Sequence, residues 1–448
     1  MASRNRKRFP LLLLGFIVAT PLWAQAPAPL RLSFAETVRR ASGGAPAVEL
    51  AGLRTDEAEA RVRQARSALL PGFSVGAGWV NRTFNSKTLG IKFPIPPGGP
   101  GLSTIIGPFD NVDARLRVTQ TLFDLSSTAR VRAARAQVRG STAEGGAVSE
   151  GAAAGAALAY LRVARAAAQV VARRADSAVA ADLVGLAQAQ KNAGVSAAID
   201  VTRARTQLVS AAGALLVARN ELDRSRIDLT RALGLDPWTP IEITDTLTAA
   251  LPVADVPATA DSIVSLALAQ RPDLAAEVAR GDAARTVRSA INAERMPRLD
   301  LAADYGLSGL TPSASVSTRQ IGVQISIPIL DGFRREGRAA EQSATVRESE
   351  VRARDLRQQI AAEVETALLD LASAQAQQAI AAERLRLAAD EMAQARERFA
   401  AGVAGNIEVI NAQASLLRAR DTDIDARFAA ATARVALARA AGLARTLH

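Results

Sequence analysis

Apolar and polar positions along this chain follow two different periods, and the two periods separate two kinds of structure. Period-two alternation, which is typical of strands with one apolar face, marks four short segments. One pair of these segments follows Pro71 and the other pair follows Pro297. Each pair leads into about 65 residues without proline, in which apolar residues recur at helical spacing. The sequence therefore predicts strands at 73–79, 112–123, 299–307 and 321–329.

The helical segments are unusually long. The first, at 125–191, would extend about 100 Å at 1.5 Å per residue. A returning helix is predicted at 196–235, and a shorter helix at 45–70 precedes the first strands. The second half repeats this plan at 272–296 and 406–441. A helix of about 25 residues and one of about 40 together match one long helix, so we expect the short helices to stack beside it. A helical stripe in the second long segment consists of Leu356, Ile360, Val364, Ala367 and Leu371.

The same break interrupts both long helical patterns. Residues 191–204 read KNAGVSAAIDVTRA and residues 399–412 read FAAGVAGNIEVINA, and the two align at a constant offset of 208 residues. The aligned glycine can adopt the left-handed conformation that ends a helix, and Asn406 can cap the helix that follows. Each copy therefore predicts the tip of a helical hairpin, near 191–200 and 399–408, with an acidic residue in the first turn of the returning helix.

The strands, long helices and tips each occur twice, which indicates an internal duplication. We predict a first structural repeat at 27–240 and a second at 263–448. A proline-rich connector at 241–262 separates them, and its apolar residues favour a short strand beside the helices. Residues 1–26 have basic residues, an apolar run and an Ala-Gln-Ala site, as in a cleaved signal peptide. No later apolar run reaches the roughly 18 residues that a membrane helix needs.

Composition narrows the class of protein further. The chain is 49% apolar but only 4% aromatic, and alanine dominates, which suits long helices that pack closely. The net charge of +11 comes mostly from arginines interleaved with acids, which indicates solvated helix faces and not a nucleic-acid interface. There is no cysteine, and His448 is the only histidine. The sequence thus predicts no catalytic residue, no cofactor and no metal site, and the protein is not expected to be an enzyme.

The predicted strands have the length and the one-sided polarity of outer-membrane strands. Four strands cannot close a barrel, and open sheet edges are not tolerated in lipid. Several copies are therefore expected to pool their strands into one membrane barrel above a helical tube. The alternative is a soluble sheet whose solvated side carries Asp113, Arg115 and Arg117.

The chain contains, in order, the motifs ALLPGFSV (68–75), TQTLFDLSSTARVRAARAQ (119–137), RALGL (231–235), RPDLAA (271–276), MPRLDL (296–301), IPILDGFRR (327–335) and RFAAGVAGNIEVINAQ (398–413). Together they resemble the motifs of the TolC-type outer-membrane efflux proteins. The resemblance extends from about Leu32 to Leu443. It implies a mainly helical fold and a homotrimer with a twelve-stranded barrel in the outer-membrane lipid. It also implies a periplasmic tunnel whose tips form a gate and meet a periplasmic adaptor protein. The protein would then be the passive exit duct of a tripartite efflux or type I secretion system, with an inner-membrane transporter that chooses the cargo.

The resemblance also assigns candidate site residues at the tips. The family's gate acids fall at Glu408 and Asn411, so this chain keeps one carboxylate and has a neutral amide at the other position; Asp200 aligns with Glu408 in the first tip. Three Glu408 side chains around an axis would favour cations, whereas a structural reading gives both acids only a helix-start role. A tyrosine and an arginine that latch the gate in other members fall at Phe399 and Ala404, which cannot make those bonds. The expected adaptor-docking residues are Gly194, Val195, Ser196, Gly402, Val403 and Ala404.

Two other classes of protein share some of these features. A periplasmic adaptor also has a signal peptide and a long helical hairpin, but it has one hairpin between compact β domains, whereas this sequence predicts two hairpins. A secreted coiled-coil scaffold would need no amphipathic strands. The exit duct is therefore the preferred prediction, and an adaptor-like or scaffold protein is the alternative.

Overall fold

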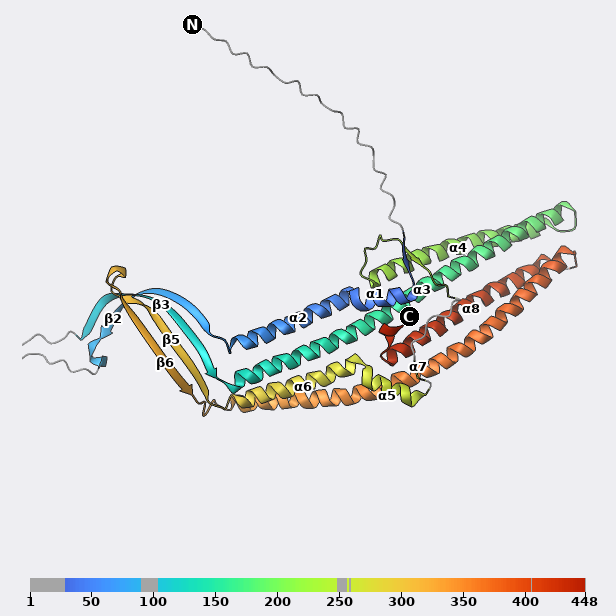
Figure 1. The fold of residues 1–448 in the computed structure, drawn as a ribbon. Coiled ribbons are helices and arrows are strands. Elements are labelled where there is room, and N and C mark those ends of the chain that lie inside the picture. Colours follow the sequence, from blue (N-terminus) through green and yellow to red (C-terminus); the bar gives the residue numbers. More distant parts are fainter. Residues whose placement is uncertain (1–28, 90–103, 248–255, 258, 404, 448) are drawn as a thin grey trace, which may run out of the picture.

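The computed structural model describes residues 29–89, 104–247, 256–257, 259–403 and 405–447. The molecule is elongated, with a four-stranded sheet at one end and the tips of two helical hairpins at the other (Figure 1). The predicted signal peptide, 1–26, lies outside the described residues. The predicted mainly helical fold, with one small antiparallel sheet and a twofold repeat of elements, is confirmed.

Two very long helices span the helical part, and the shorter helices lie along them. Helix α3 has 68 residues and contacts α2, α4, α6 and α8, while α7 has 67 residues and contacts α5, α6 and α8. Helices α2 and α6 have 22 residues each, and α4 and α8 have 35 each, as the predicted stacking requires. Helices α1 and α5 were not predicted from the sequence. The bounds are α1 Phe34–Gly44, α2 Pro46–Ser67, α3 Leu125–Asn192, α4 Ala198–Ala232, α5 Ala260–Gln270, α6 Pro272–Ala293, α7 Arg334–Ala400 and α8 Asn406–Ala440, with short 3-10 turns at Ser86–Leu89, Pro312–Ala314 and Ala444–Thr446.

The sheet has the strand order β2-β3-β5-β6, and all neighbouring strands are antiparallel. The first two strands extend further from the helices than predicted. The predicted strand at 321–329 is wrong at both ends. Its last three residues are not in a strand, because Pro328 has no N–H to donate, and its pairing starts earlier although Arg319 interrupts the apolar alternation. The strands are β2 Gly72–Asn85, β3 Ile105–Phe123, β5 Arg298–Gly309 and β6 Val316–Ser326.

Buried alanines recur every seven residues along α7 and α8. A strict seven-residue repeat corresponds to 3.5 residues per turn, so the paired helices wind around each other in a left-handed supercoil. Alanine at these positions lets the helix axes approach closely. The predicted stripe in α7 is confirmed: three of its members are buried, and Leu356 and Leu371 pack against them. The buried repeats are Ala353, Ile360, Ala367, Ala374, Ala381, Ala388 and Ala395 in α7, and Ala412, Ala419, Ala426, Ala433 and Ala440 in α8.

Five of the largest buried side chains, those of Tyr160, Phe34, Leu32, Leu161 and Leu229, belong to one core. Helix α1, which contributes Phe34, lies about halfway along the molecule (Figure 1). Strand β1, Leu30–Leu32, was not predicted; it pairs in parallel with β4, Ile241–Ile243, in the predicted connector. The rings of Phe34 and Tyr160 meet edge to face, with centroids 5.7 Å apart. The hydroxyl of Tyr160 donates to Asp245 Oδ2 at 2.8 Å and accepts from the Asp245 N–H. This core fixes the connector and the amino-terminal segment against α3.

Ionic contacts join three helices just below the sheet. Glu294, after the end of α6, accepts from Arg130 of α3 at 3.1 Å and from Arg338 of α7 at 2.8 Å. Burial opposes ionisation of Glu294, but the hydrogen bonds from Arg338 and Arg130 outweigh it, so the pKa of this carboxyl is lowered. Glu294 therefore links the first repeat to the second through its ion pairs with α3 and α7.

One face of the sheet exposes large apolar side chains, among them Phe73, Val75, Trp79, Ile321 and Ile325. Exposed apolar patches of this kind mark surfaces that meet lipid or another protein. No helix in the described part of the chain has an apolar stretch long enough to cross a membrane.

Candidate gate and docking site at the hairpin tips

The two hairpin tips have the same backbone geometry. Gly194 and Gly402 have φ values of 75° and 72°, in the left-handed region that favours glycine. In each tip, the N–H of the following valine bonds back to a helix carbonyl, of Gln190 in the first tip and Arg398 in the second, at 3.1 and 3.0 Å. These bonds close both long helices in the same way. An added Cβ at either glycine would meet nothing within 4 Å, so backbone conformation and not space requires glycine there.

Two hydrogen bonds connect the tips of the same chain to each other. Gln190 of α3 donates its Nε2 to the carbonyl of Phe399 at 2.8 Å. Asn406 of α8 donates its Nδ2 to the carbonyl of Asp200 at 3.0 Å. The prediction that Asn406 caps α8 is therefore wrong. Gly405 holds the cap position without a side-chain bond, and Asn406 is buried against the first hairpin. We call these two bonds, Gln190 to Phe399 and Asn406 to Asp200, the tip clasp.

The ring of Phe399 contributes to the apolar core beneath the second tip. It is buried with Met392, Val409 and Leu416, and Leu183 of α3 packs in the same cluster. The ring has no polar atom to offer a latch, but its carbonyl takes part in the tip clasp. The helices therefore hold Phe399 by packing and hydrogen bonding together.

The two tip acids lie in the first turns of α4 and α8, as predicted. Glu408 Oε1 lies 3.3 Å from Arg398 Nη1 across its own tip. Asp200 accepts from Ser196 Oγ at 3.3 Å and lies 3.6 Å from Arg203. Both acids thus have a positive neighbour, and exposed pairs of this kind contribute only about 0–1 kcal/mol. A free acidic ring would attract cations more strongly than these compensated carboxylates.

The remaining predicted site residues differ in exposure. Asn411 is exposed on α8, one turn after Glu408, and its side chain makes no hydrogen bond within the described residues. Val195 and Val403 are 73% and 72% exposed, so each tip ends in an accessible apolar side chain. Ser196 is half-buried because its hydroxyl turns back toward Asp200. Ala404 lies outside the described residues.

A second polar contact between the hairpins lies further from the tips. Asp176 of α3 is 3% exposed and contacts Arg173 at 3.2 Å and also Arg420 of α8. Arg173 binds both carboxylate oxygens of Asp421 at 2.5 and 2.6 Å. Burial raises the pKa of Asp176, although the two guanidinium groups partly offset this effect. The two hairpins are therefore joined by charge pairs as well as by the tip clasp.

Sequence reasoning missed three residues at the tips: Gln190, Arg398 and the role of Asn406. The offset of 208 residues pairs Gln190 with Arg398, so the two polar residues one turn before the breaks were visible as a pair. Their partners lie across a tip or on the other hairpin. No local spacing rule connects such positions.

Comparisons with known proteins identify this architecture. The family profile described as outer membrane efflux protein matches residues 37–235 and 263–443. The chain is 27% identical over 425 residues to Protein CyaE of Bordetella pertussis, covering 92% of this chain and 84% of that protein. It is 26% identical over 263 residues to the pyoverdine export outer membrane protein OpmQ of Pseudomonas putida, covering 58% of this chain and 55% of OpmQ.

Solved structures give the same fold. The CmeC outer membrane channel of Campylobacter jejuni superposes with a TM-score of 0.75 at 17% sequence identity, covering 92% of this chain and 86% of CmeC. The profile matches both repeats and leaves out mainly the amino-terminal segment and the connector. The chain therefore belongs to the outer membrane efflux protein family of TolC-like channels.

Proposed function

We propose that three copies of this chain pool their strands into one twelve-stranded outer-membrane barrel above a shared helical tunnel. One observation carries this proposal: the sheet exposes an apolar face and has two open edges, β2 and β6, within the described residues. In lipid, unpaired backbone groups at such edges would each cost several kcal/mol. Pairing β6 of one copy with β2 of the next, in the antiparallel sense, removes both edges.

The helical hairpins then form the periplasmic end of a passive exit duct. The tips are the gate, and opening requires that the second hairpin, α7 and α8, move relative to the first, α3 and α4. The tip clasp and the Asp176 contacts are the bonds that such a movement would break or rearrange. We assign Glu408, Asn411 and Asp200 to the gate. Because Arg398 neutralises part of the Glu408 charge, the closed pore is expected to favour cations weakly.

The apolar ends of the two tips are the proposed docking site for a periplasmic adaptor protein. Val195 and Val403 are exposed at the ends of the two tips, and the glycine beside each leaves room for a partner hairpin. An adaptor held there by an inner-membrane transporter would open the gate. The transporter, and not this duct, would then select the cargo.

The trimer is tested by mass measurement and cross-linking in detergent. Outer-membrane protein that remains monomeric would overturn the proposal of a trimeric barrel.

The docking site is tested by Val403→Arg, with Val209→Arg as a matched control, because Val209 is equally exposed on α4 but away from the tip. We expect Val403→Arg to abolish transport while trimers still accumulate, and Val209→Arg to leave transport intact. Transport by the Val403 variant would remove the second tip from the docking site.

A further inference from the structure

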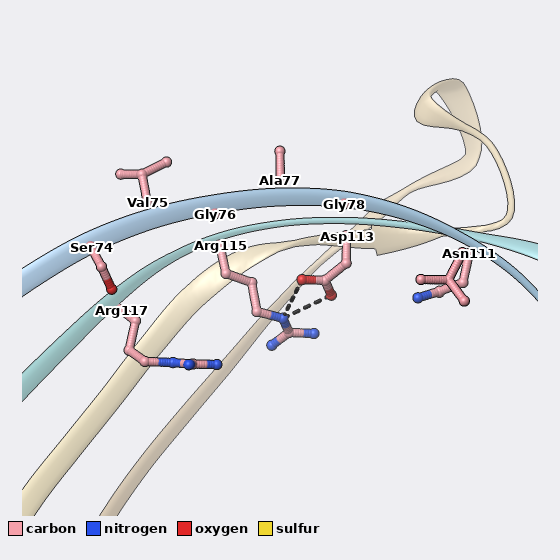
Figure 2. Close-up of a pocket in the computed structure, with 10 residues that line it drawn as sticks. Ser74, Val75, Gly76, Ala77, Gly78, Asn111, Asp113, Arg115 and Arg117 are labelled. Carbon is pink, nitrogen blue, oxygen red and sulfur yellow. Dashed lines mark hydrogen bonds and ion pairs between the residues drawn. The ribbon is translucent and has the colours of Figure 1, made fainter.

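The polar face of the sheet holds a charged pocket that the gate does not involve. The cavity has a volume of about 440 Å³ and lies over β2 and β3. Figure 2 shows Ser74, Arg115 and Arg117 on one side of the strands, with Val75 and Ala77 on the other side. The apolar side is the face that lipid would cover. The pocket therefore opens into the barrel lumen, a placement that rests on the proposed function.

Most charges on this polar face are paired with each other. Arg115 donates Nε to Asp113 at 2.8 Å and Nη1 to Asp304 at 2.6 Å. Asp300 lies 2.7 Å from Arg298 in its own strand. These are the three carboxylates that the described strands place on the polar face, and each already has a guanidinium partner.

Arg117 differs from the other arginines of the polar face of β3 and β5. It is exposed and has no ion-pair or hydrogen-bond partner among the described residues. In the sheet register it lies beside Ser74 on one side and beside Asp304, which is engaged by Arg115, on the other. Strand β6 contains no acidic residue, so a second copy paired against β2 would not neutralise Arg117 through that strand.

Glycines keep the surface beside this arginine open. Gly76 and Gly78 are the next residues on the polar side of β2 beyond Ser74, and a Cβ added at either one would meet nothing within 4 Å. A planar guanidinium that is free to bind through two N–H groups suits a carboxylate. The Ser74 hydroxyl, on the neighbouring strand, can donate to the same group. A small anion thus finds a charge, a hydroxyl and uncovered space in one place.

We propose that Arg117 and Ser74 form an anion-binding site in the barrel lumen, which takes carboxylate groups of small organic solutes as they leave the duct. In a trimer the site occurs three times around the pore, at the opposite end of the molecule from Glu408. The duct would then carry its positive charge at the exit and its partly neutralised negative charge at the gate. A single unit charge about 8 Å from the ion path changes the local ion concentration about twofold in water.

Single-channel recordings in planar bilayers test the site, with a KCl gradient for selectivity and citrate added on the barrel side as a carboxylate probe. Arg117→Gln should lower the chloride-to-potassium permeability ratio at least about twofold, and it should weaken the reduction of current by citrate. The matched control is Arg319→Gln. Arg319 is an exposed arginine of the same sheet, but it lies on the apolar face, in register with Tyr305.

The outcomes separate this site from the barrel itself. If Arg117→Gln conducts with wild-type selectivity and wild-type citrate sensitivity, the anion site is overturned and the barrel stands. If Arg319→Gln gives the same changes as Arg117→Gln, net charge and not this site is responsible, which also overturns the proposal. If the wild-type protein forms no conducting trimer, the barrel and the site fall together.

Discussion

Breaking the tip clasp should make the pore open more often. The Asn406→Ala substitution removes the donor to the Asp200 carbonyl, which is 3.0 Å away, from a side chain that is only 4% exposed. A hydrogen bond of this kind contributes about 1 kcal/mol net. The Asp200 carbonyl keeps its helical bond within α4, so we expect a loss of about 1 kcal/mol per chain.

Symmetry multiplies this effect. If the three chains of a trimer open together, the closed state loses about 3 kcal/mol, or about a hundredfold in the ratio of open to closed pores. Gln190→Ala, which removes the donor to the Phe399 carbonyl, should act in the same direction. Because the two bonds join the same pair of tips, the double variant should open at least as often as either single variant, and its departure from the sum measures their coupling.

Planar bilayer recording measures the open fraction, and trimer yield in detergent checks that assembly is unaffected. Gln188→Ala is the matched control, since Gln188 is on the same helix and its side chain donates to Asn192 Oδ1 within its own hairpin, at 3.0 Å. That variant should gate like the wild type. If Asn406→Ala and Gln190→Ala also gate like the wild type while assembling normally, the clasp does not hold the gate, and the reasoning is refuted.

Three further substitutions test other parts of the fold. Val118→Arg, on the apolar face of β3, should impair membrane assembly by about 2–4 kcal/mol if the side chain lies at the lipid midplane; normal trimer yield would mean that the sheet faces are reversed. Because the pKa of Glu294 is lowered from its ordinary value of 4.5, its stabilising effect is present above that pH and is lost as the pH falls through the lower folded value. Below about pH 4.5 the melting temperature should therefore decrease. Glu294→Gln should make the melting temperature depend less on pH in that range. Tyr160→Phe removes both bonds to Asp245 and should cost about 1–3 kcal/mol in thermal unfolding, whereas Tyr305→Phe, at an exposed tyrosine, should cost little.

The spacing of apolar residues and the positions of proline and glycine predicted the long helices and the strands of this molecule well. The period-two segments and the proline-free helical runs led to the four strands, the two long helices and the two tips, because these features depend on local sequence. The motifs predicted the efflux protein family and with it the outer-membrane location, and the family match confirms both. The glycines at 194 and 402 predicted the tips because a positive φ is a local requirement.

Contacts between distant residues were not predictable in the same way. Helix α1 is the exception, because its signals are local and were overlooked: the Ser33 hydroxyl accepts from the Glu36 N–H at its start, and Phe34, Val38 and Ala41 form its buried face. Asn406 was expected to cap a helix, the commonest role for asparagine at that position, but its side chain instead crosses to the first hairpin. The partner of Glu408 lies ten residues back across a turn, at Arg398. Such pairings depend on how two supercoils are placed side by side.

The buried core around Tyr160 and Phe34 joins α3, α4 and α8, so it is the fulcrum about which the hairpin tips would pivot. Bulky side chains hold the helices together at this level, and a second, smaller core with Phe399, Met392 and Leu416 lies beneath the tip at the far end of α8. Helix α8 has 35 residues, which gives an arm of about 50 Å. A pivot of about 10° at the fulcrum would carry the tip about 9 Å over an arm of that length. If the gate opens by such a pivot, a small rotation at the core becomes a displacement of the tip nearly as wide as a helix.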